Sequence, residues 1–196
     1  MKEQNIKFIS DLHLGHSNCL GFDNRPFKDI GEQDEMIIKR WNESVSKDDV
    51  VWILGDISWY SPTKTAEIFN QLNGTKNLCV GNHDKKLIKN YKVRSLFKEV
   101  VDYKEMKINN TDVILCHYLM PCFNKHFYGS YHLYGHVHSG FEWNMMEKVK
   151  SDMESLYDKK CNMYNVGCMM PYIDYSPKTL LEIAEFNTNN KFKREV

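Results

Sequence analysis

The sequence predicts an α/β fold whose first half forms a parallel sheet with crossover helices. Apolar, strand-like runs alternate with helix-like segments between residues 5 and 80, a rhythm typical of parallel strands joined by helices. Each run also leads directly into polar residues, as at Asp11 and Gly55-Asp56. With 196 residues, of which 42% are hydrophobic, the chain is long enough for one well-cored domain. We therefore expect a single domain over residues 1–196.

The first half contains three predicted strands and two predicted helices. The strands are NIKFIS, DVVWIL and KNLCV, at residues 5–10, 49–54 and 76–80. Residues 34–45 carry apolar side chains at helical spacing, which predicts the first helix. Ser61 followed by Pro62 resembles an N-cap with proline at the first helical position, so a second helix is predicted from there to about Leu72.

The second half predicts further strands in a different arrangement. The strand-like segments are residues 99–108, 112–117, 131–138 and 163–167. Asn109 and Asn110 separate the first two, which indicates a hairpin turn. Ser176-Pro177 is expected to open a last helix through TLLEIAEF, followed by a frayed polar tail over residues 187–196. Residues 141–160 show no clear pattern.

Composition limits the partners and the compartment. Lys plus Arg equals Asp plus Glu at 26 each, so the formal net charge is zero. No global field then draws the protein to nucleic acid or to a membrane, and an anionic ligand must be held locally. No signal peptide follows Met1 and no apolar run approaches the ~20 residues of a membrane span, so we expect a cytoplasmic protein. The six cysteines include no CxxC pair, which favours reduced thiols over disulfides.

Polar side chains with the chemistry of metal ligands follow the predicted strands. They are Asp11, His13, Asp56, Asn82, His83, His117, His136 and His138. In open α/β sheets, ligands bind at the carboxyl ends of the strands, where the loops converge on a crevice. Carboxylate oxygen, amide oxygen and imidazole nitrogen, without thiolate, suit a divalent transition metal. The sequence therefore predicts a metal centre at this edge.

The spacing of these residues supports the interpretation. Asp11 and His13 are two residues apart, so on an extended segment their side chains point the same way. The same holds for His136 and His138. Glycine precedes three of the polar positions, where a side chain would crowd the ions. Each motif alone is weak, because a single aspartate at a strand end is ordinarily a turn residue.

Taken together, the motifs resemble a known family. DLH, GD, GNHD, CH and GHVH occur in this order over residues 11–138, and the series resembles the signature blocks of the calcineurin-like metallophosphoesterase superfamily. Weaker similarity in SDLHLGH, NRPF, DEMIIKRWN, LNG and YNVG resembles a small bacterial and phage branch of phosphoesterases. The resemblance implies a four-layer α/β/β/α sandwich of two mixed sheets flanked by helices.

The resemblance also implies two divalent metal ions. The implied ligands are Asp11, His13 and His138 for one ion, Asn82, His117 and His136 for the other, and Asp56 as a bridge between them. Two ions roughly 3.5 to 4 Å apart can hold a shared hydroxide and polarise a phosphoryl group. Mn²⁺ is favoured, with Fe²⁺, Zn²⁺ and Ni²⁺ as alternatives, because an oxygen and nitrogen shell suits all of them.

His83 adjoins the implied ligand Asn82. In the family this position faces the substrate and protonates the leaving oxygen or stabilises its charge, a task that suits histidine. The alternative is a structural turn histidine. We expect Asp84 to cap the following helix.

Substrate contacts are expected from Asn82, His16 and Arg25. Arg25 would place a forked cation on a phosphate, and a surface loop arginine is an equal alternative. Better-known subfamilies do not match: purple acid phosphatases carry a metal-binding tyrosine where this chain has Trp59, and Ser/Thr protein phosphatases carry GDxVDRG where it reads GDISWYS. We expect His132 to be structural.

We therefore expect a dinuclear phosphoesterase with a small phosphorylated substrate, a nucleotide or nucleic-acid end among them, and no membrane partner. Phosphodiester hydrolysis is favoured by analogy with small bacterial members that lack a cap domain. Phosphomonoester hydrolysis is the nearest alternative. A non-catalytic scaffold is less favoured, because all seven implied ligands and His83 are present.

Overall fold

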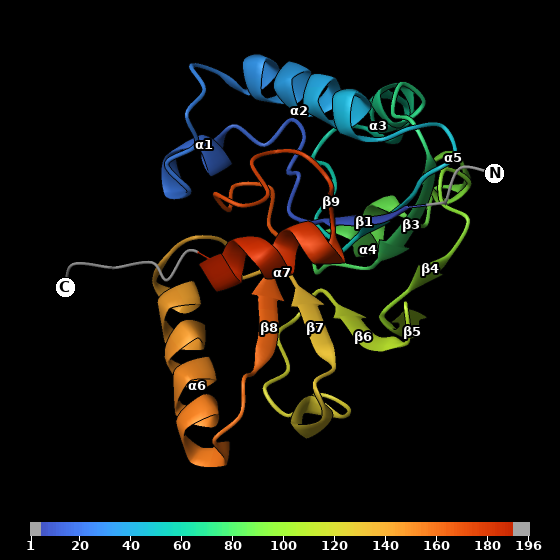
Figure 1. The fold of residues 1–196 in the computed structure, drawn as a ribbon. Helices are drawn as coiled ribbons and strands as arrows, with labels where there is room; N and C mark the ends of the chain where they lie inside the picture. The colour runs from blue at the N-terminus through green and yellow to red at the C-terminus, as the bar shows by residue number, and fades with distance from the viewer. Residues whose placement is uncertain (1–4, 190–196) are drawn as a thin grey trace.

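The computed structural model describes residues 5–189, which form two β-sheets flanked by helices (Figure 1). The first sheet has the strand order β4-β3-β2-β1-β9. Its strands are β1 (Ile6–Ile9), β2 (Val50–Ile53), β3 (Thr75–Cys79), β4 (Val100–Val101) and β9 (Lys178–Thr179). Strands β1 to β4 run parallel, and β9 pairs antiparallel with β1.

The second sheet has the order β5-β6-β7-β8. Its strands are β5 (Tyr103–Ile108), β6 (Thr111–Cys116), β7 (Tyr131–Tyr134) and β8 (Asn162–Asn165). Strand β5 pairs antiparallel with β6, and the other pairs are parallel. Both sheets are therefore mixed, and the expected α/β fold class is confirmed.

Several of the helices begin at a side-chain cap. They are α1 (Asn18–Phe22), α2 (Ile30–Ser44), α3 (Pro62–Phe69), α4 (Asp84–Leu87), α5 (Tyr91–Arg94), α6 (Phe141–Tyr157), α7 (Leu180–Asn189) and the 3-10 helix η1 (His126–Tyr128). Asp29 caps α2 by accepting from the Glu32 N–H, and α2 buries Ile37 and Trp41. Ser61 caps α3 as predicted, with Pro62 as its first residue.

Three expectations about the elements need correction. Residues 99–108 form two strands, because β4 pairs with β3 in the first sheet while β5 pairs with β6 in the second. The last helix begins at Leu180 and not after Ser176: Thr179 and Glu182 exchange hydrogen bonds as a capping box, and β9 precedes it. The helix continues to Asn189, so the predicted tail starts too early, and its residues 190–196 lie outside the described part.

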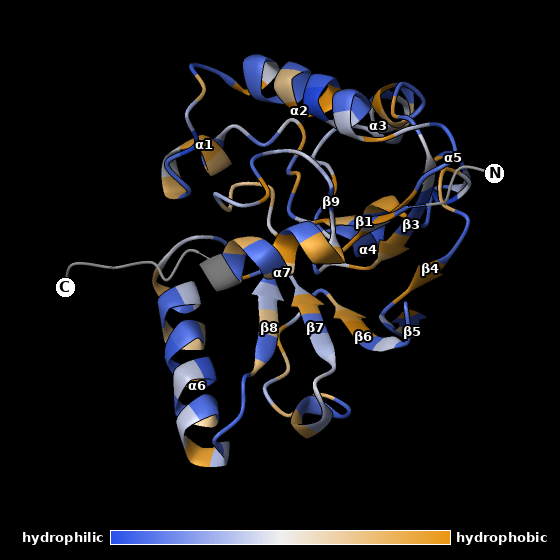
Figure 2. Ribbon diagram, in the orientation of Figure 1, coloured by the Kyte–Doolittle hydropathy of each residue, from blue (hydrophilic) through white to orange (hydrophobic). Residues whose placement is uncertain are grey.

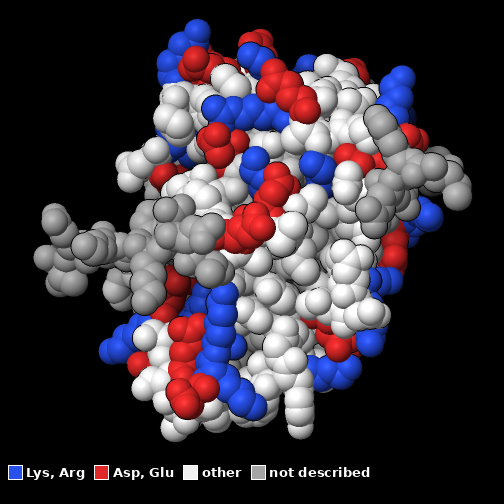
Figure 3. All heavy atoms as spheres, viewed as in Figure 1, with Lys and Arg blue, Asp and Glu red and all other residues white. Residues whose placement is uncertain are grey.

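Helix α6 occupies the stretch without a readable pattern. It has no buried residue, and Figure 2 shows that its surface is largely hydrophilic. Acidic and basic side chains are interspersed over the face drawn in Figure 3, as the zero net charge would suggest. A helix with so little buried surface has no strong apolar stripe. The sequence of residues 141–160 therefore shows no clear helical periodicity.

The hydrophobic core joins the two sheets. One cluster of buried side chains includes Ile53 and Leu78 from the first sheet and Leu115 and Leu133 from the second, in keeping with the proposed single domain. A smaller cluster on the second sheet packs against Met153 of α6. All six cysteines are free thiols. Within residues 5–189, no helix has both the length and the apolar composition to cross a bilayer.

His132 on β7 is fully buried. Its Nε2 accepts from the Met120 N–H at 3.0 Å, and its Nδ1 lies 3.2 Å from the Ile114 carbonyl oxygen, to which it donates. Both ring nitrogens are thus used by the neutral imidazole. Burial lowers the pKa of His132 to about 4.

We expect the free energy of unfolding to fall as the pH decreases from 6.5 towards about 4, the folded-state pKa of His132. In this window the unfolded chain binds a proton that the folded protein excludes, so the stability present above it is progressively lost. The lowering of the His132 pKa corresponds to roughly 3 kcal/mol of unfolding free energy. Urea unfolding between pH 4 and 7 should show a steeper pH dependence for the parent than for His132→Gln. Equal pH dependence would contradict this role of His132.

Candidate metal centre

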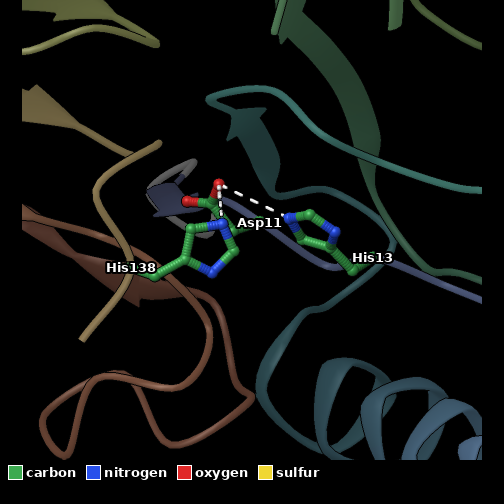
Figure 4. Close-up of side chains that lie close together, drawn as sticks. All are labelled: Asp11, His13 and His138. Atoms are coloured by element: carbon green, nitrogen blue, oxygen red, sulfur yellow. Dashed lines mark ion pairs between the residues drawn. The ribbon is translucent and has the colours of Figure 1, made fainter. Parts of the chain in front are cut away.

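Six of the expected ligands lie in two groups of three at the carboxyl ends of the strands. The first group is Asp11, His13 and His138, and the second is Asp56, His117 and His136. In each group one possible ligand atom per residue lies within 4.8 Å of the others. Figure 4 shows one oxygen of the Asp11 carboxylate facing a ring nitrogen of both His13 and His138. Each group combines ligands that follow strands of both sheets.

Asp56 lies between the two groups. Its Oδ2 is 3.8 Å from His13 Nε2 in the first group and 3.6 Å from His117 Nε2 in the second. Asp11 Oδ1 is 3.9 Å from His13 Nε2 and 3.8 Å from His138 Nε2. These separations are too long for hydrogen bonds, and they leave room for a cation between the atoms.

The His13 ring gives the clearest sign that the residues fit a metal ion. Its Nε2 is buried and has no hydrogen-bond partner, although it faces the carboxylates of Asp11 and Asp56. Buried polar atoms are normally satisfied. A divalent cation would satisfy the nitrogen lone pair and both carboxylates together.

His117 is oriented in the way that metal-binding histidines are. Its Nδ1 lies 2.7 Å from the Leu54 carbonyl oxygen, which can only accept, so Nδ1 carries the proton. Its Nε2 therefore presents a lone pair to Asn82 Oδ1, 2.9 Å away. Two lone-pair atoms at this distance would be stabilised by a cation, and the backbone acceptor fixes the tautomer. Asn82 thus lies at the second group, where it was expected.

The backbone at the ligands differs from the expected extended geometry. Asp11, His13, Asp56, His136 and His138 all have positive φ angles, between 48° and 73°. Non-glycine residues rarely adopt this left-handed region, and such strain is concentrated at functional sites. The interpretation of DxH and HxH as extended segments is therefore wrong, because the chain turns as soon as β1 and β7 end.

Glycines allow the chain to approach both carboxylates closely. A Cβ at Gly81 would lie 2.2 Å from Asp56 Oδ1, and one at Gly135 would lie 2.5 Å from Asp11 Oδ2. The adjacent backbone donates instead: the His136 N–H lies 3.2 Å from the Asp11 oxygens, and the His83 N–H lies 3.1 Å from Asp56 Oδ1. A larger residue at either glycine would displace a carboxylate.

Burial dominates the electrostatics of the two groups. It lowers the pKa of His13 far below the usual range and raises the pKa of Asp56. Burial also acts to lower the pKa of His138, but the hydrogen bond to Asp23 and the nearby carboxylates outweigh it, so this pKa is raised. The groups are arranged to receive positive charge from a bound cation.

Arg25 does not face a substrate, contrary to the expectation. It is 5% exposed, and its guanidinium donates to the Asp23 carboxylate, to Gln33 Oε1 and to the carbonyl oxygens of Asp11 and Leu12. Four of these contacts are hydrogen bonds, and one guanidinium nitrogen also forms an ion pair with Asp23, so every guanidinium nitrogen has a partner within the protein. Neither the phosphate-binding role nor the surface loop alternative fits, and Arg25 instead supports the backbone at Asp11.

Asp23 is a functional residue that the sequence reading missed. Its Oδ2 lies 2.9 Å from His138 Nδ1 and 2.8 Å from an Arg25 guanidinium nitrogen. Arg25, Asp23 and His138 thus form a chain that leads to the first group. A carboxylate on the far nitrogen orients a metal-binding imidazole and increases its basicity. Only the charges of FDNRPF hinted at this pair in the sequence.

We expected Asp84 to cap α4, but the helix has no side-chain capping hydrogen bond. Asp84 is buried, and its carboxylate accepts from the backbone N–H groups of Asp56, Ile57 and Gly81. It therefore joins the loop after β2 to the loop after β3. Burial raises the pKa of Asp84.

His83 and His16 lie at the edge of the first group. His83 is exposed, with its ring 4.5 Å from Trp59 and 6.3 Å from His13, measured between centroids. His16 stacks on Trp59 at 4.0 Å, and its Nδ1 lies 3.0 Å from His13 Nδ1. Both lie beside the ligand His13, and their roles stay predictions.

Comparison with known proteins gives consistent matches. The sequence pattern of the calcineurin-like phosphoesterase family matches residues 5–162. An uncharacterized protein of Methanocaldococcus jannaschii is 36% identical over 114 residues, which are 57% of this chain and 62% of that protein. The Gene 66 protein of Mycobacterium phage L5 is 41% identical over 83 residues, 41% of this chain and 40% of that protein. The chain thus spans about three fifths or less of these curated relatives.

A solved structure shares the fold. The crystal structure of a protein of unknown function from Aquifex aeolicus, AQ665, superimposes with a TM-score of 0.70 at 23% sequence identity. The alignment covers 94% of this chain and all of that chain. The similarity therefore extends through both sheets, and at this identity it concerns the fold alone.

Loss of the Asp23 carboxylate should weaken metal binding. We expect Asp23→Asn to reduce the affinity of metal-stripped protein for Mn²⁺ by about 10- to 100-fold, because His138 loses its charged acceptor. Isothermal titration calorimetry measures this effect. The matched control is Asp152→Asn on the exposed face of α6, which should bind as the parent does. Parent-like affinity in folded Asp23→Asn would refute the orienting role.

Proposed function

Because the chain belongs to the calcineurin-like phosphoesterase family, which implies a phosphorylated substrate, we propose that it is a dinuclear metal-dependent hydrolase of phosphodiesters. The observation that carries the proposal is the unpartnered, buried His13 Nε2, facing the buried carboxylates of Asp11 and Asp56. In a purely structural site this nitrogen would stay unpartnered, and only hydrogen bonds from Ser10, the His136 N–H and the His83 N–H would offset the two buried charges. A scaffold role gives no reason for the unpartnered nitrogen.

The proposed ligand assignment follows the two groups. Asp11, His13 and His138 would hold one ion, His117, His136 and Asn82 the other, and Asp56, lying between both groups, would bridge them. When bound, the two ions supply positive charge that polarises the phosphoryl group and makes a water molecule acidic enough to attack it. Mn²⁺ is the favoured ion, with Fe²⁺, Zn²⁺ or Ni²⁺ as alternatives.

His83 is the proposed proton donor to the leaving oxygen. Its backbone N–H is held by the Asp56 carboxylate, so its position is fixed relative to the proposed bridging ligand. Its ring is exposed and can reach an atom outside the ligand shell. Protonation of an alkoxide leaving group by a positioned side chain contributes about 10² to 10⁴ in rate.

A phosphodiester suits the open surroundings of the site. The side chains of Phe22, Trp59 and Tyr118 contact ligand histidines and are 53%, 37% and 41% exposed. The second ester group of a diester can therefore extend into solvent or onto these rings without displacing buried residues.

Hydrolysis with added metals tests the reaction class. Metal-stripped protein should hydrolyse bis(p-nitrophenyl) phosphate with a higher kcat/KM than p-nitrophenyl phosphate once Mn²⁺, Ni²⁺, Zn²⁺ or Mg²⁺ is added separately. A higher kcat/KM for the monoester would refute the diester preference. Inactivity on both with every metal, in folded protein that binds two ions, would refute the proposed hydrolase and favour a binding role.

Two substitutions separate proton donation from metal binding. His83→Ala should lower kcat by about 10²-fold or more while metal content stays near that of the parent. Asp56→Ala should lose both metal and activity, because the Asp56 carboxylate lies within 4 Å of His13 in the first group and of His117 in the second. Metal content is measured by plasma mass spectrometry after dialysis. Parent-like turnover in His83→Ala would disprove its role, and His126→Ala, on η1, serves as the control.

A further inference from the structure

Exposed aromatic side chains border the ligand groups. Phe22 is at the end of α1, Trp59 is in the loop after β2, and Tyr118 follows β6. Neither hydrophobic cluster within residues 5–189 includes any of the three. Large exposed apolar side chains gathered at one place usually mark a binding surface, so these rings are available to a ligand.

Trp59 contacts one implied metal ligand, His13, and the proposed proton donor, His83. Its ring centroid is 4.6 Å from that of His13, 4.0 Å from that of His16 and 4.5 Å from that of His83. The planes of Trp59 and His16 are nearly parallel, at 4°. A phosphoester bound at the first group with its leaving oxygen near His83 would therefore have Trp59 beside it.

Phe22 extends this surface along the first group. Its ring is 5.2 Å from His138 in an edge-on arrangement and 5.8 Å from His16. Phe22, His16 and Trp59 thus form a continuous set of rings, which we call the aromatic wall. Tyr118 is separate, because its ring contacts His117 and His136 of the second group.

We propose that the aromatic wall binds the planar base of a nucleotide, so that the substrate is a nucleoside phosphodiester. This proposal rests on the proposed function, since the phosphate would be held at the ligand groups. Base stacking on aromatic side chains tolerates all bases, because each presents a π face. Nucleotides are abundant biological phosphoesters that carry a planar aromatic base a few bonds from the phosphorus.

The buried Arg25 gives no support for a polyphosphate tail. Its guanidinium donates only into the protein. It therefore offers no donor to a second phosphate. Binding of the nucleoside part then depends on the rings.

Equilibrium binding of paired ligands tests the wall. We would measure the Kd of Mn²⁺-loaded protein for adenosine 5′-monophosphate and for ribose 5-phosphate, which differ only in the base. Adenosine 5′-monophosphate should bind roughly tenfold more tightly in the parent, in line with the contribution of one stacked base. Trp59→Leu and Phe22→Leu should each reduce this ratio and leave the Kd for ribose 5-phosphate unchanged. The matched control is Tyr128→Leu, an 85% exposed ring on η1, which should keep the ratio.

The outcomes separate this inference from the proposed function. Equal Kd values for the two ligands in the parent would refute the wall while leaving the phosphate site intact. A ratio kept in both wall variants but lost in Tyr118→Leu would also refute it, because the base would then stack at the second group. If neither ligand binds to protein that holds two Mn²⁺ ions, both proposals fail.

Discussion

The burial of two carboxylates is the constraint on which the rest of the site depends. Asp11 and Asp56 are 0% and 1% exposed, and the imidazole beside both, His13, is disfavoured in its charged form by burial. Desolvating a carboxylate costs several kcal/mol unless charge or hydrogen bonds compensate. The protein supplies the Ser10 hydroxyl and backbone N–H groups from the loops after β3 and β7, and the proposed cations would supply the rest. The close glycines are needed because any side chain there would occupy the space of the carboxylates.

The same constraint explains where the protein carries strain. Five of the ligands adopt left-handed backbone conformations, at a cost of order 1 to 3 kcal/mol each. Hydrogen bonds to buried side chains offset this conformational cost. Asp84 joins the loops after β2 and β3. Arg25 donates to the carbonyl oxygens of Asp11 and Leu12. Both side chains are buried, and each makes at least two hydrogen bonds to the backbone of these loops. The core beneath, shared by the two sheets, provides the rigid base.

The sequence predicted the ligand residues well, because each follows a predicted strand and its residue type indicates metal chemistry. It predicted the contacts of Arg25 and Asp84 poorly, because their hydrogen-bond partners depend on the tertiary fold. The ordered motifs led to the fold class and brought Asp11 and His138 to one site across 127 residues. Local pattern could not reveal that Arg25 turns inward to Asp23 or that Asp84 binds three distant N–H groups, because these depend on tertiary contacts. The switch from the first sheet to the second at Asp102, between β4 and β5, could not be predicted for the same reason. The sequence of a strand does not show which strand it pairs with. Helix α6 was not predicted because none of its residues is fully buried, and only a few, such as Trp143 and Met153, are partly buried against the core.

The division of the ligands between the two sheets has a consequence for the order of events during synthesis. The chain emerging from the ribosome presents Asp11, His13, Asp56 and Asn82 long before His117, His136 and His138 are made. The second group cannot then be complete until translation has passed residue 136, and the first until it has passed residue 138. The edge of the first sheet remains open beside β1 until β9 has been added. For most of its time as a nascent chain the protein therefore carries only part of the candidate metal site and an unpaired strand edge. Metal acquisition would be one of the last steps of its folding.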